Sequence, residues 1–319
     1  KGNCVNCHSF CGGNPDKMLL HMRSILPGTY LFKDGKKEKL DTKTSHTISP
    51  LVYPYWHLSG NYVAFSVNKT SQVLHVRNMN RIEVYDEASD VVVYDVNKRE
   101  IVTSALLSSE QAYETFPSFS PDGKYLYYCT AVAVDTMPKQ YREVKYSLCR
   151  VAFDSSMRTF GTQVDTLYHA LREGRSVSFP RVSPDGKQLV FTVSDYGNFS
   201  IWHKDADLYS LDLQTGQISC LDALNSEDVE SYHSWSSNSR WLVFSSRRED
   251  GLYTKPYIAY MDETGNPAKP ILLPQRNPKD FYESQMNAYN VPEFVTGEVP
   301  YTSREISDFA YEAPVLQVK

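Results

Sequence analysis

The sequence lacks the signals of several protein classes. It contains no G-x-S-x-G elbow, no H-E-x-x-H motif and no P-loop, so the serine-hydrolase, zinc-peptidase and nucleotide-binding patterns are missing. No apolar run approaches the roughly 18 to 20 residues that a membrane-spanning helix needs, and no transmembrane segment is expected. Acidic and basic residues are interspersed over a net charge of −5, so no nucleic-acid partner is expected.

What the sequence does contain is a repeat. An extended apolar stretch, a polar turn and a second stretch ending in an aromatic occur four times, at intervals of about 50 to 65 residues. The copies begin at Pro54 (PYWHLSGNYVAF), Pro117 (PSFSPDGKYLYY), Pro180 (PRVSPDGKQLVF) and His233 (HSWSSNSRWLVF). Because one such unit cannot bury its own apolar face, this pattern indicates a propeller or another array.

The turn inside each copy indicates a β-hairpin. In the SPDG sequences that begin at Ser120 and Ser183, proline presets the backbone for a type I turn, and glycine takes the left-handed conformation that follows. The turns at Ser59 and Ser237 are degenerate versions of the same sequence. Each copy is therefore expected to form two neighbouring antiparallel strands.

A second hairpin follows each copy. These hairpins are expected at residues 90–107, 146–168, 207–224 and 256–273. Four strands per repeat make a propeller blade, so the fold class is all-β. Blades of this kind usually run about 40 to 45 residues, so the excess length is expected in loops at residues 67–87 and 135–145.

The two ends of the chain are expected to share one blade. Residues 28–42 resemble an outer hairpin without an inner pair, and residues 288–294 resemble an inner strand without an outer hairpin. Their pairing would give a five-bladed β-propeller over residues 28–299, with no exposed sheet edge. Six blades are the alternative if sequence upstream of Lys1 contributes another.

Helical signals surround this predicted propeller. Residues 1–27 are expected to form a separate N-terminal segment, with a helix that Asn14 caps and that Pro15 begins. A second helical stretch is expected at residues 278–289. The C-terminal tail, residues 300–319, shows no periodicity and is expected to pack on the propeller or trail from it.

The N-terminal segment carries a C-x-x-C-H motif at Cys4, Cys7 and His8. This motif is the attachment signature of c-type haem. In a helical turn the three residues share one face, so that both thiols can bond the vinyl groups while His8 ligates the iron. The motif therefore predicts haem c.

A second axial ligand to that iron would come from the expected helix after Pro15. Met18, His21 and Met22 would lie on one face of it, and His21 is the first candidate, followed by Met18. Histidine and methionine in this position shift the redox potential in opposite directions. The alternative is that such a stripe packs against a core.

Two other interpretations of the cysteine cluster stay open. Cys4, Cys7, Cys11 and His21 have the composition of a Cys₃His zinc site, although such sites more often divide their ligands into two distant pairs. In an oxidising compartment, a disulfide among the three cysteines is the structural alternative. The cluster thus predicts haem c, with zinc or a disulfide as rivals.

Three further cysteines lie in the repeat region. Cys129 and Cys149 fall on strands expected to be antiparallel neighbours in the second blade. They could form a cross-strand disulfide or remain two buried thiols. Cys220 is expected to be a single core residue.

Enzymatic chemistry has one weak signal. Five-bladed propellers can carry glycosidase sites in which paired carboxylates flank a central funnel. Five acidic residues fall near expected blade ends: Glu114, Asp135, Asp195, Asp205 and Glu230. Acidic residues at loop ends are usually solvated, so the absence of catalysis is the favoured interpretation.

These motifs together resemble a known family. The SPDGK copies at Ser120 and Ser183 are similar to the repeats of TolB-like propellers, also called WD40-like or PD40 repeats. With the N-terminal sequence from Cys4 to Phe10, the chain resembles TolB-like proteins of Bacteroidota that carry a haem c signature. The resemblance covers essentially the whole chain.

The resemblance implies an envelope protein, periplasmic or associated with the outer membrane, whose signal or lipid anchor lies outside this chain. It implies a non-catalytic electron-transfer or protein-binding component of an envelope complex. A cofactor-free scaffold that binds protein or glycan is the alternative, and a glycosidase is a weaker one.

Overall fold

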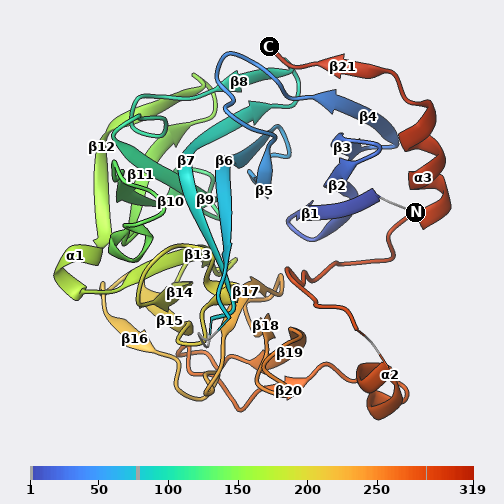
Figure 1. Cartoon of the computed structure of the whole chain (residues 1–319). Helices are drawn as coiled ribbons and strands as arrows, with labels where there is room; N and C mark the ends of the chain where they lie inside the picture. The colour runs from blue at the N-terminus through green and yellow to red at the C-terminus, as the bar shows by residue number, and fades with distance from the viewer. Residues whose placement is uncertain (1–2, 77–79, 285) are drawn as a thin grey trace.

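The computed structural model describes residues 3–76, 80–284 and 286–319, and for residues 3–6 it describes the backbone alone. Nearly all regular structure in this part of the chain is β, and the strands form five sheets. Figure 1 shows the five sheets arranged around a common centre in chain order, which is the architecture of a β-propeller. The predicted all-β propeller fold is confirmed.

The sheets are numbered here in chain order. Sheet 1 contains β1 (Asn3–Cys11), β2 (Asn14–Ser24), β3 (Gly28–Lys33), β4 (Lys36–Asp41) and β21 (Val315–Gln317). Sheet 2 contains β5 (Val52–Trp56), β6 (Tyr62–Leu74), β7 (Ile82–Asp95) and β8 (Glu100–Val102). Sheet 3 contains β9 (Ala112–Phe119), β10 (Tyr125–Val132), β11 (Ser147–Asp154) and β12 (Thr159–Tyr168).

The last two sheets follow the same plan. Sheet 4 contains β13 (Ser176–Val182), β14 (Gln188–Ser194), β15 (Asp207–Asp212) and β16 (Ile218–Cys220). Sheet 5 contains β17 (Glu230–Trp235), β18 (Trp241–Ser246), β19 (Lys255–Tyr260) and β20 (Ile271–Leu272). The inner and outer hairpins expected from the four repeat copies are thus present in sheets 2 to 5.

The helices are short. They are α1 (Ala170–Glu173), α2 (Pro278–Ser284) and α3 (Ser303–Glu312), with 3₁₀ turns at Tyr141–Glu143 and Ser200–Trp202. In the described parts of the chain, no helix has the length and apolar character needed to cross a bilayer. The helix expected at residues 278–289 corresponds to α2, which ends at Ser284.

The first strand of each sheet faces the centre. Contacts run from β1 to β5, from β5 to β9, from β9 to β13 and from β13 to β17. Each of these strands contains a β-bulge, and one bulge residue has a positive φ between 51° and 54°. These residues are Cys7, Tyr53, Phe116, Phe179 and Tyr232. The repeat therefore has a fifth copy in β1, where cysteine replaces the aromatic residue.

The predicted N-terminal helix is wrong. Asn14 and Pro15, which suggested a helix start, are instead the first two residues of strand β2, which pairs with β1 on one side and β3 on the other. Because β2 and β3 belong to one sheet, the expected boundary after residue 27 has no structural counterpart. Side chains along β2 alternate between two cores, as expected for a strand. One core contains Met18, Leu20 and Met22, and the other contains Leu19.

The prediction that residues 28–42 and 288–294 pair in one blade is also wrong. Residues 288–294 form no strand, and residues 28–42 already have inner partners in β1 and β2. Both ends nevertheless enter sheet 1, because β21 adds to its outer edge in parallel with β4. Figure 1 shows β21 beside β4.

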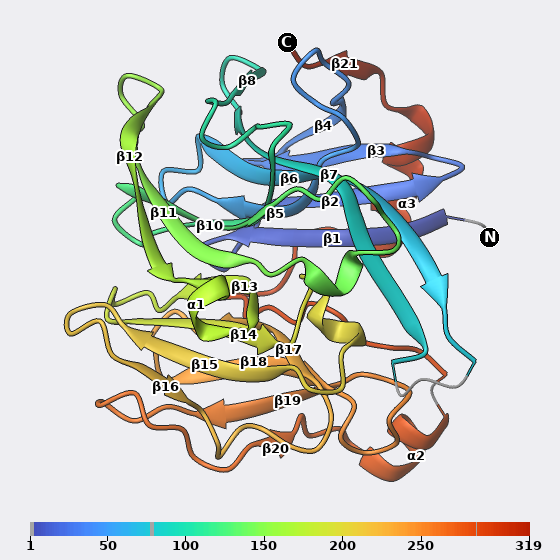
Figure 2. The same cartoon turned by 60° about the vertical axis from the view of Figure 1, so that its left-hand side comes forward.

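An irregular stretch, residues 289–296, fills the place between sheets 5 and 1 and is called here the closing segment. The Tyr289 amide donates to the Thr254 carbonyl at 3.0 Å, and the Thr296 amide donates to the Gly13 carbonyl at 2.9 Å. Gly13 has a φ of +77°, and a Cβ there would lie 3.1 Å from a closing-segment carbonyl oxygen, so glycine permits this contact. Figures 1 and 2 show the segment passing from sheet 5 to sheet 1.

The loop expected at residues 67–87 is instead a long hairpin arm. Strands β6 and β7 remain paired as far as Leu74 and Ile82. Figure 2 shows this arm extending from sheet 2 toward sheets 4 and 5. The arm leaves sheet 2 at the end opposite the β5–β6 turn, so the two ends of the central axis are built differently.

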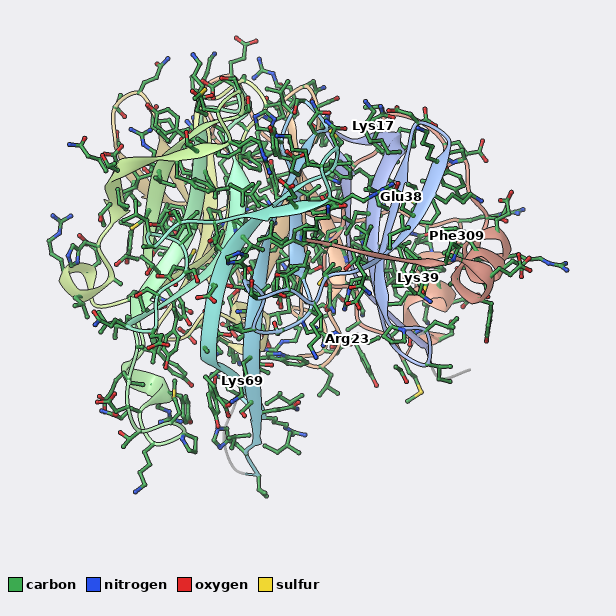
Figure 3. The ribbon with its side chains drawn as sticks, turned by 90° about the horizontal axis from the view of Figure 1, so that it is seen from above. Lys17, Arg23, Glu38, Lys39, Lys69 and Phe309 are labelled. Carbon is green, nitrogen blue, oxygen red and sulfur yellow. The ribbon has the colours of Figure 1, made fainter. Side chains whose placement is uncertain are left out.

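Helix α3 covers the outer part of sheet 1. Phe309 lies 5.9 Å from Phe32 between ring centroids, and Lys39 Nζ donates to the Ala310 carbonyl at 3.2 Å. Figure 3 shows Phe309 and Lys39 where the helix meets the sheet. The tail from residue 300 thus packs on the propeller.

Candidate functional site

Aromatic side chains close the central axis. The ring centroids of Tyr53 and Phe116 lie 4.5 Å apart, and those of Phe179 and Tyr232 lie 4.9 Å apart. Phe116 and Phe179 connect the two pairs at 5.7 Å. With Cys7, these bulge residues form an axial ring around the centre of the propeller.

The motif C-x-x-C-H is part of this ring system. Burial is the main cause that raises the pKa of the Tyr53 and Tyr232 phenols, and Cys7 lies close enough to both to add a smaller upward contribution. His8 Nε2 lies 3.4 Å from Glu293 Oε2 in the closing segment. The Cys4 side chain lies outside the described residues.

The arrangement predicted for haem attachment is wrong. Haem attachment was expected to use a helical turn, whereas the backbone from Cys4 to His8 lies in strand β1 and contains a bulge at Cys7. The helical turn expected to bring both thiols and His8 to one face is therefore absent. Haem attachment itself stays a prediction from the motif.

The two candidate axial ligands lie on opposite faces of β2. Met18 packs in the core between sheet 1 and α3. His21 is buried with its Nδ1 3.2 Å from Thr29 Oγ1, and burial, with a smaller contribution from Arg23, lowers its pKa to about 4. The expected common face does not exist.

The alternative cysteine sites are not assembled either. The register places Cys11 at the turn end of the β1–β2 pair and His21 toward the other end. Among the described side chains, no group of three or more His, Cys, Asp or Glu is arranged to hold a metal. Cys129 and Cys149 are free, buried thiols in different cores, so the disulfide between them is absent.

The strongest candidate site is a cavity of about 580 Å³ at the turn end of the axis. We call it the tryptophan pocket. Its aromatic wall consists of Phe10, Tyr55, Trp56, Phe119, Trp235, Trp241 and Phe294. Cavities of about 300 to 1,000 Å³ with mainly apolar walls are typical of small-ligand sites.

The repeat positions these walls. Trp56, Phe119 and Trp235 each stand three residues after the bulge residue of an inner strand, and Phe10 and Val182 occupy the same position in β1 and β13. Two indole rings are fixed by hydrogen bonds, because Trp56 Nε1 donates to the Ser9 carbonyl at 3.2 Å and Trp235 Nε1 to the Arg181 carbonyl at 3.1 Å.

Arg181 is the charged residue of the pocket wall. It is 7% exposed, and its guanidinium lies 3.9 Å from the Phe179 ring centroid and 4.8 Å from that of Tyr55. Nη1 donates to the Pro180 carbonyl at 2.8 Å. Burial lowers its pKa to about 10, so Arg181 remains a cation at neutral pH.

Glu293 of the closing segment faces the same pocket. Ser9 Oγ donates to its Oε1 across a long 3.5 Å, and within the described structure Oε2 has no hydrogen-bond donor. Burial raises the pKa of Glu293 to about 8, despite the opposing effect of Arg181. At neutral pH this carboxyl is therefore mostly protonated.

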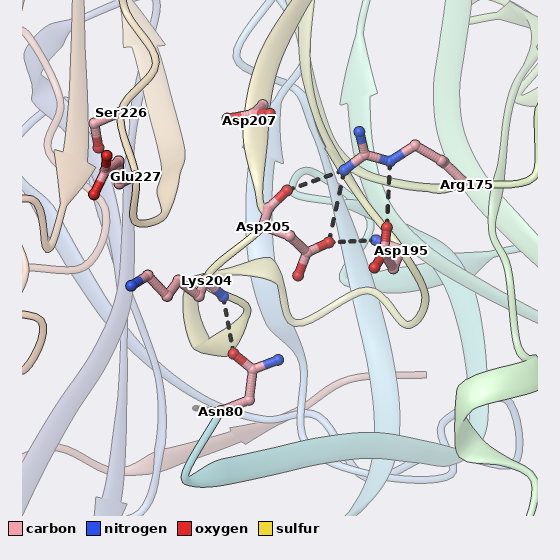
Figure 4. A pocket seen from close by; sticks show the side chains of 8 residues that line it. All are labelled: Asn80, Arg175, Asp195, Lys204, Asp205, Asp207, Ser226 and Glu227. Carbon is pink, nitrogen blue, oxygen red and sulfur yellow. Dashed lines mark hydrogen bonds and ion pairs between the residues drawn. The ribbon is translucent and has the colours of Figure 1, made fainter. Parts of the chain in front are cut away.

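A second, polar cavity of about 630 Å³ lies at the arm end (Figure 4). Arg175 lies 3.7 Å from Asp195 Oδ1 and 3.6 Å from Asp205 Oδ2, and the Asp195 amide donates to Asp205 at 2.7 Å. Figure 4 shows Arg175 between the two carboxylates. Both acids already have partners in the free protein.

The structure disperses the other predicted acids. Glu230 is buried and ion-paired to Arg248 at 2.9 Å. Glu114 is buried in β9, where desolvation and nearby Asp90 raise its pKa to about 8. Asp135 is exposed in the loop after β10. Of the five predicted acidic residues, only Asp195 and Asp205 lie in contact with each other.

A buried polar network that no sequence motif indicated lies beneath the arm. Glu83 Oε1 lies 2.9 Å from His203 Nε2, and Tyr196 donates to Glu83 Oε2 at 2.7 Å. On the same strand, Asp86 accepts hydrogen bonds from Tyr146 at 2.9 Å and from amides of Asn68 and Asn198. Burial raises the pKa of Asp86 to about 6. The network ties the arm to sheets 3 and 4.

Comparison with known proteins adds to this geometry. No protein-family model and no curated protein matches the sequence. TolB from Acinetobacter baumannii is 15% identical with a TM-score of 0.49, over 86% of this chain and 58% of that chain. An oligogalacturonate lyase in complex with manganese is 12% identical with a TM-score of 0.50, over 83% of this chain and 64% of the lyase.

The propeller of Dos1 is a third similar structure, 13% identical with a TM-score of 0.48, over 86% of this chain and 62% of that one. At such identities the likeness concerns the fold alone. The chain spans less than two thirds of the length of each of these three proteins.

Proposed function

We propose that this chain is a non-catalytic, five-bladed TolB-like propeller of the cell envelope, in the periplasm or at the outer membrane, that binds a ligand or partner segment in the tryptophan pocket. The observation that carries the proposal is the convergence of aromatic side chains from several sheets on one cavity at the axis. Burial of flat apolar groups against such walls supplies binding energy of about 25 cal/mol per Å².

The proposal is of a cofactor-free protein. It is supported by the strand conformation of β1, in which Cys7 takes the place of an aromatic residue in the axial ring. The electron-carrier function has the motif alone in its favour. Protein matured in a host with haem-attachment machinery is expected to be colourless and of unmodified mass, and a Soret band with a covalent mass increase would overturn this part of the proposal.

Binding can be tested on the pocket wall. Trp241 is 38% exposed, so Trp241→Ala removes a wall of the pocket with little effect on folding. We expect N-acetyl-phenylalanine or its amide to change the tryptophan fluorescence of the wild type, and Trp241→Ala to weaken binding about 3- to 10-fold. Ile271→Ala, at an exposed position of the same sheet, is the matched control.

Two results would contradict the pocket assignment. One is that neither probe binds the wild-type protein. The other is that both bind Trp241→Ala as tightly as Ile271→Ala.

A further inference from the structure

Arg181 differs from the other largely buried arginines in its partners. Arg158 pairs with a carboxylate at 2.9 Å, Arg247 at 3.0 Å and Arg248 at 2.9 Å. Across the described ranges, no carboxylate lies within ion-pair distance of the Arg181 guanidinium. Because a buried charge is costly without an ionic partner, Arg181 is a cation that lacks a counter-ion among the described residues.

The position of this cation points to a ligand. Arg181 lines the tryptophan pocket, whereas the three paired arginines do not. In the other inner strands the equivalent position is Ser9, Tyr55, Ser118 or Ser234, so the propeller fold does not require arginine there. The cation is therefore a feature of this pocket.

We propose that the tryptophan pocket binds a ligand with one carboxylate, seated on Arg181, that is attached to a flat apolar group held against the indole rings. This inference rests on the proposed function and names the chemical class of its ligand. Two sources share this chemistry: the C-terminus of a peptide that ends in an apolar residue, and a free aromatic acid.

The charges around Arg181 favour a single negative charge. The titratable groups that face it and Glu293 are Tyr55 of β5, His8 of β1, Cys129 of β10 and His233 of β17. A protonated Glu293 can donate a hydrogen bond to a carboxylate, and the guanidinium fork matches a carboxylate in two-point geometry. Above about pH 8 Glu293 is ionised and would repel the ligand, so binding should weaken there.

The walls favour an apolar group next to the carboxylate. Pro121, Val182, Pro184, Leu58 and Val295 add apolar surface beside the aromatic residues, and the polar side chains of the lining are mainly serines, with Asn238 and Thr296. The indole N–H groups of Trp56 and Trp235 are occupied by backbone carbonyls, so these rings present apolar surface rather than hydrogen-bond donors.

The test compares a charged with a neutral probe. Calorimetric titration of the full chain with N-acetyl-phenylalanine and with its amide should show the acid binding about 10- to 100-fold more tightly, as expected for charge-assisted hydrogen bonds. Arg181→Gln should abolish that preference. Arg150→Gln removes another arginine stacked on a tyrosine, outside the pocket, and should keep it.

The outcomes separate the two proposals. If acid and amide bind equally and Trp241→Ala weakens both, the pocket stands and the carboxylate inference is overturned. If neither binds, both fail. If galacturonate binds through Arg181 and the aromatic acid does not, the inference that the ligand carries a flat apolar group is overturned. Should Arg181→Gln fail to fold, the acid-to-amide ratio in the wild type decides alone.

The same titration distinguishes the two sources. A peptide C-terminus predicts that Ala-Ala-Phe with a free carboxylate binds more tightly than N-acetyl-phenylalanine, and that its amide loses this gain. A free aromatic acid predicts that phenylacetate binds at least as tightly as the peptide. Above pH 8 the wild type should lose the tighter binding of the acid, whereas Glu293→Gln should keep it. This pair of results would support the role of Glu293, and a wild-type preference that does not change with pH would contradict it.

Discussion

The two ends of the central axis handle buried charge in opposite ways. At the arm end, Glu83 and His203 are fully buried against each other, and Asp86 has three side-chain donors. At the pocket end, Arg181 is buried with no carboxylate partner among the described residues, and Glu293 Oε2 accepts no hydrogen bond. A buried charge that is paired within the chain fixes structure, whereas an unpaired one is available to a ligand.

The largest expected effect is at the arm end. Glu83→Ala leaves His203 and the Tyr196 hydroxyl without their buried acceptor, so the free energy of unfolding should fall by about 3 kcal/mol or more. Urea denaturation measures this change. Glu87→Ala, at an exposed position on the same arm, should leave the midpoint unchanged. Equal midpoints for the two variants would refute the distinction between the ends.

A smaller effect concerns the pH dependence of Glu293. Its folded-state pKa of about 8 lies above the unfolded value, so its neutral form stabilises the fold. That contribution is complete below about pH 4.5 and is lost as the pH rises toward 8. The wild type should therefore lose about 1 to 3 kcal/mol relative to Glu293→Gln between pH 5 and 8.

Two comparisons check the assignment to Glu293. Glu298→Gln, an exposed position shortly after the closing segment, should follow the wild-type profile. Parallel stability profiles for the wild type and Glu293→Gln would show that burial does not shift this carboxyl. Denaturant titrations at four pH values are sufficient.

The smallest effect on stability should come from Arg181→Met. Loss of the aromatic stacking is offset by removal of a buried, unpaired charge, so the free energy of unfolding should change by no more than about 1 kcal/mol. The preference for the acid probe over its amide should nevertheless be lost. A destabilisation as large as that of Glu83→Ala would mean that Arg181 is structural, and the contrast between the ends would disappear.

The repeats made most of the fold predictable, because the SPDG turns and their flanking strands are local signals. The copy in β1 escaped detection since Cys7 replaces the aromatic residue, and its turn contains Gly12 and Gly13 in place of SPDG. Asn14 and Pro15 then favoured helix by their local preferences, and tertiary pairing with β3 overrode them.

The candidate site was less accessible to sequence reasoning. Attention to Cys4, Cys7 and His8 followed from a short motif, whose meaning depends on a helical turn that β1 does not form. Arg181 had a detectable signal, because no other copy has arginine at its position. Glu83 had none, since its burial arises from the long-range packing of the arm against sheet 4.

The closing segment joins ring integrity to ligand affinity. Glu293 and Phe294 belong both to the pocket and to the stretch that bridges the last sheet and the first by hydrogen bonds. Any opening of that seam dismantles one wall of the cavity. A molecule bound in the cavity therefore stabilises the closed ring by its own binding free energy. The propeller should resist unfolding most when the cavity is occupied.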